Sequence, residues 1–216
     1  MEEDTPPIIY QFAFLGDSEV GKTAIFRKML TGKFSPNMVS TIGVDKKTIT
    51  YKNLNVENKG NKYKKNFEIS IFDTAGQEKF RAMTKNYIKN SDGIILIYDI
   101  TYRKSFEHIG KWLESILEIL SDWKNSDYLI IILGNKLDLI GQEEKKREVT
   151  TIEAKTLCDS KGILWGGECS AKDFTEEQFN NLFKYFTIKI FNKIGMKESV
   201  SVKDLKKKKK GKERRC

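Results

Sequence analysis

The sequence predicts an α/β protein with a doubly wound, mainly parallel sheet. Three observations predict this class: a glycine-rich octapeptide directly follows an apolar run, later apolar runs alternate with amphipathic stretches, and two of those runs are apolar throughout, as in strands buried on both faces. The 216 residues, 39% hydrophobic and 32% charged, are enough for one sizeable core. No apolar run approaches the ~20 residues of a membrane-spanning helix.

The first predicted strand, Ile8–Leu15, leads into the octapeptide Gly16–Thr23, GDSEVGKT, which fits the phosphate-binding pattern G-x-x-x-x-G-K-[ST]. A glycine after a strand lets the next turn bare several backbone N–H groups, and the following helix points its positive dipole end at the same spot. A triphosphate fits such a cradle. We therefore expect Lys22 to reach the outer phosphates and the Thr23 hydroxyl to take one ligand position on Mg²⁺.

Four further strands are predicted in the middle of the chain. Thr48–Tyr51 and Phe67–Phe72 are expected to pair antiparallel, joined by a long, polar hairpin loop over Asn53–Lys65. The apolar runs Gly93–Tyr98 and Tyr128–Leu133 are predicted as central strands of the sheet.

Two amphipathic helices follow from apolar residues at helical spacing. The first lies between the two central strands and is expected to pack on the sheet through Trp112, Leu113, Ile116, Leu117 and Leu120. The second is predicted from about Glu176 to Lys193, with an apolar stripe formed by Phe179, Leu182, Phe183, Phe186, Ile190 and Phe191. Beyond about residue 197 a lysine run replaces the apolar pattern, so disorder is expected there.

The pentapeptide DTAGQ, residues 73–77, ends the predicted strand Phe67–Phe72. An aspartate at the carboxyl end of a strand beside a phosphate loop can hold Mg²⁺ through a water molecule, which is the role expected of Asp73. The Gly76 amide can meet a terminal phosphate. Gln77 then falls beside the site of attack, where its amide can orient a nucleophilic water without a shifted pKa.

Two further motifs follow successive predicted strands and indicate a base. Asn135–Asp138, NKLD, includes a carboxylate at Asp138 that can accept from N1–H and the 2-amino group of guanine, a donor pair that adenine lacks. Ser170–Lys172, SAK, follows the next predicted strand, Gly162–Glu168, and could offer a backbone N–H to the guanine oxygen, while the stems of Lys136 and Lys172 could cover the ring. Ligands of open α/β sheets bind at this edge, so the joint placement favours GTP over ATP.

The formal charge of +9 is concentrated at the C-terminus: residues 203–215 carry a net +7 and the remaining chain +2. The basicity is therefore a tail property, and no nucleic-acid partner is expected. The acidic, proline-containing N-terminus, residues 1–7, is unlike a secretory signal and predicts a cytosolic protein. Cys158 and Cys169 are expected to fill the core, and His108, the one histidine, falls in a helical pattern.

The motifs together resemble the Ras superfamily of small GTPases, and most closely its Rab branch, from about Tyr10 to Phe191. The resemblance rests on GDSEVGKT, STIGVD, DTAGQEKFR, GIILIYDIT, SFEHIGKW, GNKLD and ECSAK. It implies the P-loop NTPase (small GTPase) fold, a six-stranded, mostly parallel sheet with helices on both faces. It also implies a G domain over residues 9–195, between an N-terminal extension, 1–8, and a flexible polybasic tail, 196–216, that ends in cysteine.

The resemblance implies a GTP/GDP switch in vesicle and membrane trafficking, with slow, Mg²⁺-dependent GTP hydrolysis that relies on an activating protein. Gln77 and Lys22 would be the catalytic residues, and Thr23, Thr41 and Asp73 would hold the metal. The residues implied to bind nucleotide are Ser18, Glu19, Val20, Gly21, Lys22, Thr23, Ala24, Phe34, Thr41, Gly76, Asn135, Lys136, Asp138, Ser170, Ala171 and Lys172. Thr41 would belong to switch I, residues from Asp73 to about Thr84 would form switch II, and Phe34 would pack on the guanine.

The tail implies a membrane attachment. Cys216 sits where the family carries geranylgeranyl groups, although it lacks the three following residues of a C-a-a-X box. One lipid anchors weakly, and the lysines could supply a second signal at an anionic membrane surface. The expected location is the cytosol and the cytoplasmic face of an intracellular membrane. Expected partners are effectors, exchange factors, GTPase-activating proteins and, if Cys216 is prenylated, a GDP-dissociation inhibitor or escort protein.

Several residues depart from the Rab pattern. Lys46 stands where phenylalanine is usual, Phe72 where tryptophan is usual, and Glu19 lies at a phosphate-loop position that is often small. The hairpin around 53–65 is several residues longer than usual, and Trp165–Gly167 is one residue too long before Glu168. These departures affect the choice of effector and the tightness of nucleotide binding.

Three alternatives remain open from the residues. One is a GTP-binding scaffold that signals by occupancy with little hydrolysis. Another is a P-loop kinase or ATPase, which the NKLD motif and the absence of an obvious arginine-rich lid disfavour. A third is a nucleic-acid binder that works through the lysine tail.

Overall fold

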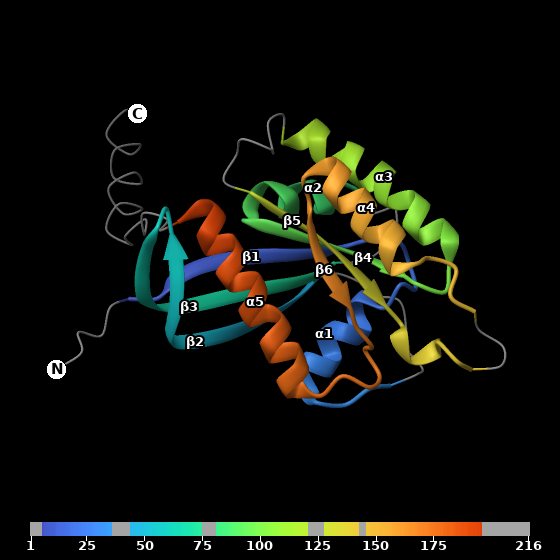
Figure 1. The fold of residues 1–216 in the computed structure, drawn as a ribbon, viewed down its shortest axis with the longest axis horizontal. Helices are drawn as coiled ribbons and strands as arrows, with labels where there is room; N and C mark the ends of the chain where they lie inside the picture. Colours follow the sequence, from blue (N-terminus) through green and yellow to red (C-terminus); the bar gives the residue numbers. More distant parts are fainter. Residues whose placement is uncertain (1–5, 36–43, 75–80, 121–127, 143–145, 196–216) are drawn as a thin grey trace, which may run out of the picture.

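The computed structural model describes residues 6–35, 44–74, 81–120, 128–142 and 146–195, with the backbone alone for 81–84. Its sheet has six strands in the order β2-β3-β1-β4-β5-β6, and only the β2–β3 pair is antiparallel (Figure 1). The elements are β1 (Ile8–Leu15), α1 (Lys22–Thr31), β2 (Val44–Asn58), β3 (Asn61–Thr74), α2 (Arg81–Asn90), β4 (Gly93–Asp99), α3 (Arg103–Ile119), β5 (Leu129–Asn135), α4 (Thr151–Lys161), β6 (Leu164–Glu168) and α5 (Glu176–Ile194).

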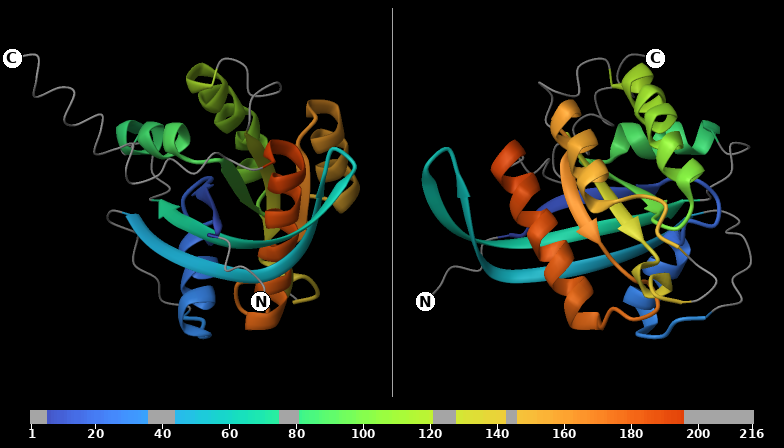
Figure 2. Two further views of the ribbon diagram at one scale, coloured as in Figure 1. Left: turned by 90° about the vertical axis from the view of Figure 1, so that its left-hand side faces the viewer. Right: turned by 45° about the vertical axis from the view of Figure 1, so that its right-hand side comes forward.

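Helices cover both faces of the sheet, as the sequence predicts. One apolar cluster joins α1 and α5 to one face, and a second joins α2, α3 and α4 to the other (Figures 1 and 2). The central strands feed both clusters in alternation: Ile95 and Ile97 of β4 enter the first, while Ile94, Leu96 and Tyr98 enter the second. This alternation explains why β4 and β5 are apolar throughout, since strands covered on both sides have no polar face.

The two predicted helices form close to their expected bounds. α5 begins with a capping box, in which Thr175 and Gln178 satisfy each other's backbone N–H, and its whole predicted stripe packs in the first cluster. In α3, Leu113 and Ile116 are buried, but Leu117 is 41% exposed. The prediction that Leu117 packs on the sheet is wrong: α3 enters the apolar cluster on that face through Phe106, Ile109, Leu113 and Ile116, and Leu117 lies outside it.

The predicted hairpin loop over Asn53–Lys65 is also wrong. β2 and β3 stay paired from Leu54 opposite Lys65 to Asn58 opposite Asn61, and only Lys59 and Gly60 turn the chain. Both turn residues have positive φ, 50° and 80°, which is the tight turn that matches strand twist. The residues are polar because this part of the hairpin has one solvent face; Leu54 and Val56, two residues apart, form its buried face.

The extra residue before Glu168 is accommodated as a bulge in β6. Ile132 lies opposite Trp165 and Gly134 opposite Glu168, so three steps on β6 match two on β5. Gly167 adopts φ 93° there, with open space where a Cβ would lie. Downstream of the bulge, Cys169 N still donates to Gly134 O at 2.8 Å, so the added length does not displace the residues that follow.

Among the helices of the described segments, none is long and apolar enough to span a membrane.

Candidate functional site

The candidate residues gather at one edge of the sheet. β1, β3, β4, β5 and β6 run parallel, so their carboxyl ends meet at this edge. The octapeptide follows β1, Asp73 is the penultimate residue of β3, Asn135 ends β5, and Ser170–Lys172 follows β6. Residues separated by more than 150 positions in the sequence are thereby brought into hydrogen-bonding reach of common neighbours.

Two glycines of the octapeptide are fixed by close neighbours. Gly16 has φ 136°, and a Cβ on it would lie 2.2 Å from Ile97 O in β4. Gly21 has φ 94°, and a Cβ there would lie 2.3 Å from Asn135 Nδ2. Both the backbone conformation and the lack of space therefore require glycine. The loop that results leads directly into α1, whose N-terminus carries no acidic residue in its first turn.

Lys22 is held inside the phosphate loop. Its ammonium donates to Gly16 O at 2.9 Å and to Asp17 O at 2.5 Å, and the residue is only 5% exposed. Burial lowers the pKa of Lys22 to about 8, against the opposing effects of the Asp73 and Asp17 carboxylates. A desolvated cation that is enclosed by backbone carbonyls is suited to meet an anionic ligand that enters the loop.

Asp73 is a buried carboxylate beside this cation. It is 0% exposed, and neither carboxylate oxygen has a hydrogen-bond partner of normal geometry among the described residues. Burial raises the pKa of Asp73 to about 6, although the nearby Thr23 hydroxyl and Lys22 ammonium oppose that rise. A carboxylate with unused oxygens next to a threonine hydroxyl is a donor set of the kind that Mg²⁺ prefers, so these residues fit the ion.

Asn135 joins the phosphate loop to the β6–α5 loop. Its side chain is 1% exposed; Nδ2 donates to Val20 O at 2.9 Å, and Oδ1 accepts from Ala171 N at 3.1 Å. The same Oδ1 accepts a weak bond from Cys169 Sγ at 3.6 Å. Asn135 therefore fixes the relative positions of two loops, a role that its sequence motif alone does not indicate.

The other base-binding candidates are oriented by their own partners. Asp138 Oδ1 accepts from Ser170 Oγ at 2.7 Å, which ties the carboxylate to the β6–α5 loop. Lys136 has φ 72° and pairs with Asp99 at 2.8 Å. Lys172 is exposed, and its carbonyl accepts from Lys28 at 3.2 Å. Asp138 and Ser170 thus form one cluster with Asn135 and Ala171.

The remaining predicted residues divide into those that the structure describes and those that it does not. Ser18 and Glu19 are exposed on the phosphate loop, and Ala24 lies in the first turn of α1. Phe34 follows α1 and is 37% exposed, so its stacking on a base stays a prediction. Thr41, Gly76, Gln77 and Cys216 lie outside the described residues.

Glu19 adopts a left-handed backbone conformation, with φ 65°. This conformation costs a side-chain-bearing residue about 1–2 kcal/mol relative to glycine, and the Glu19 carboxylate adds a negative charge beside a loop built for anions. Glu19→Gly should therefore raise the free energy of unfolding by about 1 kcal/mol and slow the release of a bound GDP analogue. Stopped-flow fluorescence measures the release.

Lys59→Gly is the matched control for Glu19, because Lys59 has φ 50° in the hairpin turn, away from the phosphate loop. It should give a similar gain in stability with an unchanged release rate. Equal release rates for the Glu19→Gly variant and the wild type would dismiss the charge effect.

The sequence did not indicate that side chains of α3 contact the phosphate loop. Asp17 Oδ2 lies 2.6 Å from His108 Nδ1, and Asp17 Oδ1 accepts from Trp112 Nε1 at 2.9 Å. His108 and Trp112 are four residues apart on α3, so they share one face of the helix. That spacing was available in the sequence, but nothing there indicated that α3 would cross the loop at Asp17.

Removing this contact should loosen the phosphate loop. In a His108→Ala/Trp112→Phe variant Asp17 loses both partners, and we expect GDP release to accelerate by roughly tenfold, because two hydrogen bonds to a charged group are worth about 1.5 kcal/mol or more. Glu107→Ala, one residue away on the exposed side of α3, should leave the release rate unchanged. Unaltered release in the double variant would show that Asp17 needs no support from α3.

A bidentate ion pair that the sequence did not reveal braces the end of β6. Arg147 donates to both oxygens of Glu168, at 2.7 and 2.8 Å, and Thr151 adds a bond of 2.9 Å. Despite its burial, the arginine and threonine keep the pKa of Glu168 below its usual value. Glu168 directly precedes Cys169 and Ser170, so this pair holds the β6–α5 loop in place.

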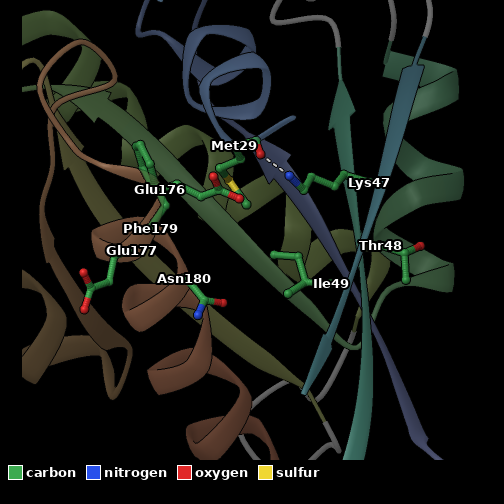
Figure 3. A pocket seen from close by; sticks show the side chains of 8 residues that line it. All are labelled: Met29, Lys47, Thr48, Ile49, Glu176, Glu177, Phe179 and Asn180. Carbon is green, nitrogen blue, oxygen red and sulfur yellow. Dashed lines mark hydrogen bonds between the residues drawn. The ribbon is translucent and has the colours of Figure 1, made fainter. Parts of the chain in front are cut away.

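A cavity of about 600 Å³ lies elsewhere, between α1, β2 and α5 (Figure 3). Met29, Ile49 and Phe179 supply apolar walls, and the Lys47 ammonium donates to Met29 O. Glu176 stands near that ammonium and raises the pKa of Lys47, although burial lowers it more. The cavity offers one cation, already bonded, and it does not include the phosphate-loop residues, so it is a weaker candidate site.

Comparisons with known proteins agree with this geometry. A sequence model of the Ras family matches residues 11–192. Ras-related protein Rab-19 of Xenopus laevis is 35% identical over 80% of this chain and 73% of its own length, and Ras-related protein Rab-4 of Dictyostelium discoideum is 35% identical over 88% and 82%. Ras-related protein Rab-44 of Homo sapiens is 36% identical over 77% of this chain, which spans only 14% of that longer protein. The chain belongs to the Ras family and, within it, to the Rab-type small GTPases.

Proposed function

We propose that this protein is a GTP/GDP switch that acts in intracellular membrane trafficking and hydrolyses GTP to GDP and phosphate. The observation that carries the proposal is the position of Asn135, whose side chain bonds the phosphate loop at Val20 O and the β6–α5 loop at Ala171 N. A phosphate cradle and a base-reading cluster are thereby held at a fixed separation. That arrangement supports a guanine nucleotide rather than a free phosphate.

Each part of the nucleotide has a proposed partner. The backbone of Ser18–Ala24 and the Lys22 ammonium would bind the phosphates. Asp138 would accept from the guanine edge, and a backbone N–H of the loop Ser170–Lys172 would meet the guanine oxygen. Thr23 and Asp73 would hold Mg²⁺, which when bound neutralises phosphate charge and orients the leaving group. Phe34 and the stems of Lys136 and Lys172 would cover the ring.

The switch itself rests on residues whose roles come from the family resemblance. Thr41 would join the metal only when GTP is bound, and the Gly76 amide would meet the terminal phosphate. Gln77 would position the attacking water for in-line displacement, while Lys22 stabilises the charge that develops on the phosphate. Among the described residues, the ion pairs of Arg103 and Arg147 join glutamates outside the phosphate loop, and slow turnover with reliance on an activating protein is proposed as well.

Single-turnover GTP hydrolysis tests the enzymatic part of the proposal. Wild-type protein loaded with GTP should convert it slowly to GDP, and Gln77→Leu should be at least about tenfold slower, because the water loses its positioning group. The alternative, a GTP-binding scaffold, predicts negligible hydrolysis by both proteins. Hydrolysis by Gln77→Leu at the wild-type rate would remove Gln77 from the mechanism.

The tail supplies the proposed link to membranes. We propose that residues 9–195 form the G domain and that residues 196–216 tether it through prenylated Cys216 and the lysine run, after an N-terminal extension over residues 1–8. The anchored protein would sit on the cytoplasmic face of an intracellular membrane. Effectors, exchange factors and GTPase-activating proteins, and a GDP-dissociation inhibitor or escort protein, are proposed as partners on the same basis.

A further inference from the structure

The β2–β3 hairpin has an arm, residues 52–66, that extends beyond the rest of the sheet. β1 pairs with β3 only from Phe67 onward, so within the described segments the arm has no third strand. A bulge between Tyr51 and Leu54 separates it from the sheet, with Asn53 at φ 53° and its N–H bonded to Asn66 Oδ1 at 2.9 Å. Bulges increase local twist, and Figure 2 shows the arm curling away from the sheet and around α5.

The arm is fixed to the C-terminal end of α5. Asn58 Nδ2 donates to Phe191 O and Asn192 O, both at 2.9 Å, which satisfies carbonyls that the helix end leaves open. The Tyr63 ring meets Phe191 edge-on at 5.7 Å between centroids. Figures 1 and 2 both show the tip of the arm beside this helix end. The arm is therefore a packed part of the domain, with one face buried and one exposed.

The exposed side of the arm is strongly basic. Five lysines lie between residues 52 and 66 against one acid, Glu57: Lys52, Lys59, Lys62, Lys64 and Lys65. Lys52, Lys59, Lys62 and Lys64 are exposed, and Lys59 is at the tip of the turn. The end of α5 adds Lys189 and Lys193 and carries no acid after Glu177. A favourable helix dipole accounts for Lys193 in the last turn, but it does not account for the lysines of the arm.

The polybasic tail begins at this same place. Gly195 caps α5 through a bond from its N–H to Phe191 O, and a Cβ on it would lie 3.4 Å from Asn58 of the arm. The 21 residues that follow carry the net +7 segment and Cys216. A chain spans at most about 3.5 Å per residue, so the first tail lysines start within a short reach of Lys59 and Lys62.

We propose that the arm and the end of α5 form a second, folded contact with an anionic lipid surface, which orients the G domain when the tail is bound. This inference rests on the proposed membrane role of the tail. Charge complementarity favours the occupant: lysines near an anionic leaflet each add to binding, and the tail brings that leaflet to this end of the molecule. The alternative is that the lysines only protect an exposed strand edge from pairing with other chains, in which case replacing them would leave lipid binding unchanged.

Vesicle binding by the full, unlipidated chain tests the proposal, with phosphatidylcholine vesicles that contain or lack phosphatidylserine. Lys59→Gln/Lys62→Gln should weaken binding to the phosphatidylserine vesicles by roughly 25-fold, since each lysine contributes about fivefold. Lys104→Gln/Lys111→Gln removes the same charge from α3, on the opposite face of the sheet, and should weaken that binding less than about twofold because salt screens charges remote from the arm.

A fluorescent label reports the contact directly. In a Cys216→Ser background, a bimane attached at Lys62→Cys should shift to the blue on phosphatidylserine vesicles, whereas the same label at Lys104→Cys should not. Equal weakening by the two double variants, or no shift at residue 62, overturns the proposal. The proposal is also overturned if Lys59→Gln/Lys62→Gln abolishes binding to duplex DNA but leaves vesicle binding unchanged, a result that would assign the surface to nucleic acid.

GDP binding measured on the same samples separates this inference from the proposed function. Intact GDP binding without an arm-specific vesicle effect overturns the inference alone. Arm-specific vesicle binding by a chain that does not bind GDP overturns the proposed switch and leaves the membrane contact standing.

Discussion

Replacement of Gly21 with alanine should abolish stable nucleotide binding. The new Cβ would lie 2.3 Å from Asn135 Nδ2, and the residue holds φ 94°. Left-handed strain and overpacking together should lower the free energy of unfolding by about 2–4 kcal/mol. Since Asn135 also bonds Val20 and Ala171, its displacement moves both loops of the site. We expect GDP affinity to fall by at least about a hundredfold, which is about 3 kcal/mol.

Gly32→Ala is the matched control for this prediction. Gly32 ends α1 with φ 69°, and nothing lies within 4 Å of a Cβ placed on it. Gly32→Ala should lower the free energy of unfolding by only about 1 kcal/mol, the cost of a left-handed alanine, and should leave the GDP affinity unchanged. Chemical denaturation and titration of a fluorescent GDP analogue measure the two effects. Equal losses of affinity for the two variants would mean that the contact with Asn135 has no part in nucleotide binding.

Replacement of Asp73 with asparagine should move stability and function in opposite directions. Burial raises the pKa of Asp73 to about 6 in spite of the nearby Thr23 hydroxyl and Lys22 ammonium, so the ionised carboxylate destabilises the protein when no metal ion is bound. Removing that charge should raise the free energy of unfolding of the nucleotide-free, Mg²⁺-free protein by about 1–3 kcal/mol. The affinity for GDP in the presence of Mg²⁺ should fall by roughly 10–100-fold, because the carboxylate that orients the ion's ligands is lost.

Asp99→Asn provides the comparison for Asp73. Asp99 is also buried, at 6% exposure, but it accepts from Thr101 N and pairs with Lys136 at 2.8 Å. Its neutralisation should lower stability by about 1–3 kcal/mol, opposite in sign to Asp73→Asn. If Asp73→Asn is destabilised by a similar amount, Asp73 has a structural partner in the protein and is not kept open for a cation.

The parts of the fold that depend on periodic apolar residues could be predicted from the sequence. β1, β4, β5 and α5 formed within about two residues of their expected bounds because each buries a complete apolar pattern. The arm of the hairpin could not be predicted in this way, since its exposed face is polar and only Leu54 and Val56 mark the buried one. The sequence does contain a residue pair suited to a two-residue hairpin turn, Lys59–Gly60. The asparagines and lysines around this pair made the whole stretch resemble a loop.

The candidate site could likewise be predicted only in part from the sequence. Motif spacing predicted which residues meet at the sheet edge, because parallel strands must end on the same side. It could not predict the contacts that cross between elements, such as His108 and Trp112 with Asp17 or Arg147 with Glu168. These pairs depend on how helices cross loops, which no local pattern encodes. Asn135 was predicted to serve the base, and its bonds to two loops were found only in the structure.

Nucleotide titration of the nucleotide-free protein tests the central claim most directly. GTP, GDP and ATP should be compared with and without Mg²⁺. GTP and GDP should bind at least about a thousandfold more tightly than ATP, since a site that hydrogen-bonds one ligand edge rejects an analogue that lacks it, and chelation of Mg²⁺ should weaken both. ATP binding within about tenfold of GTP would contradict a guanine-specific site built on Asp138 and Asn135.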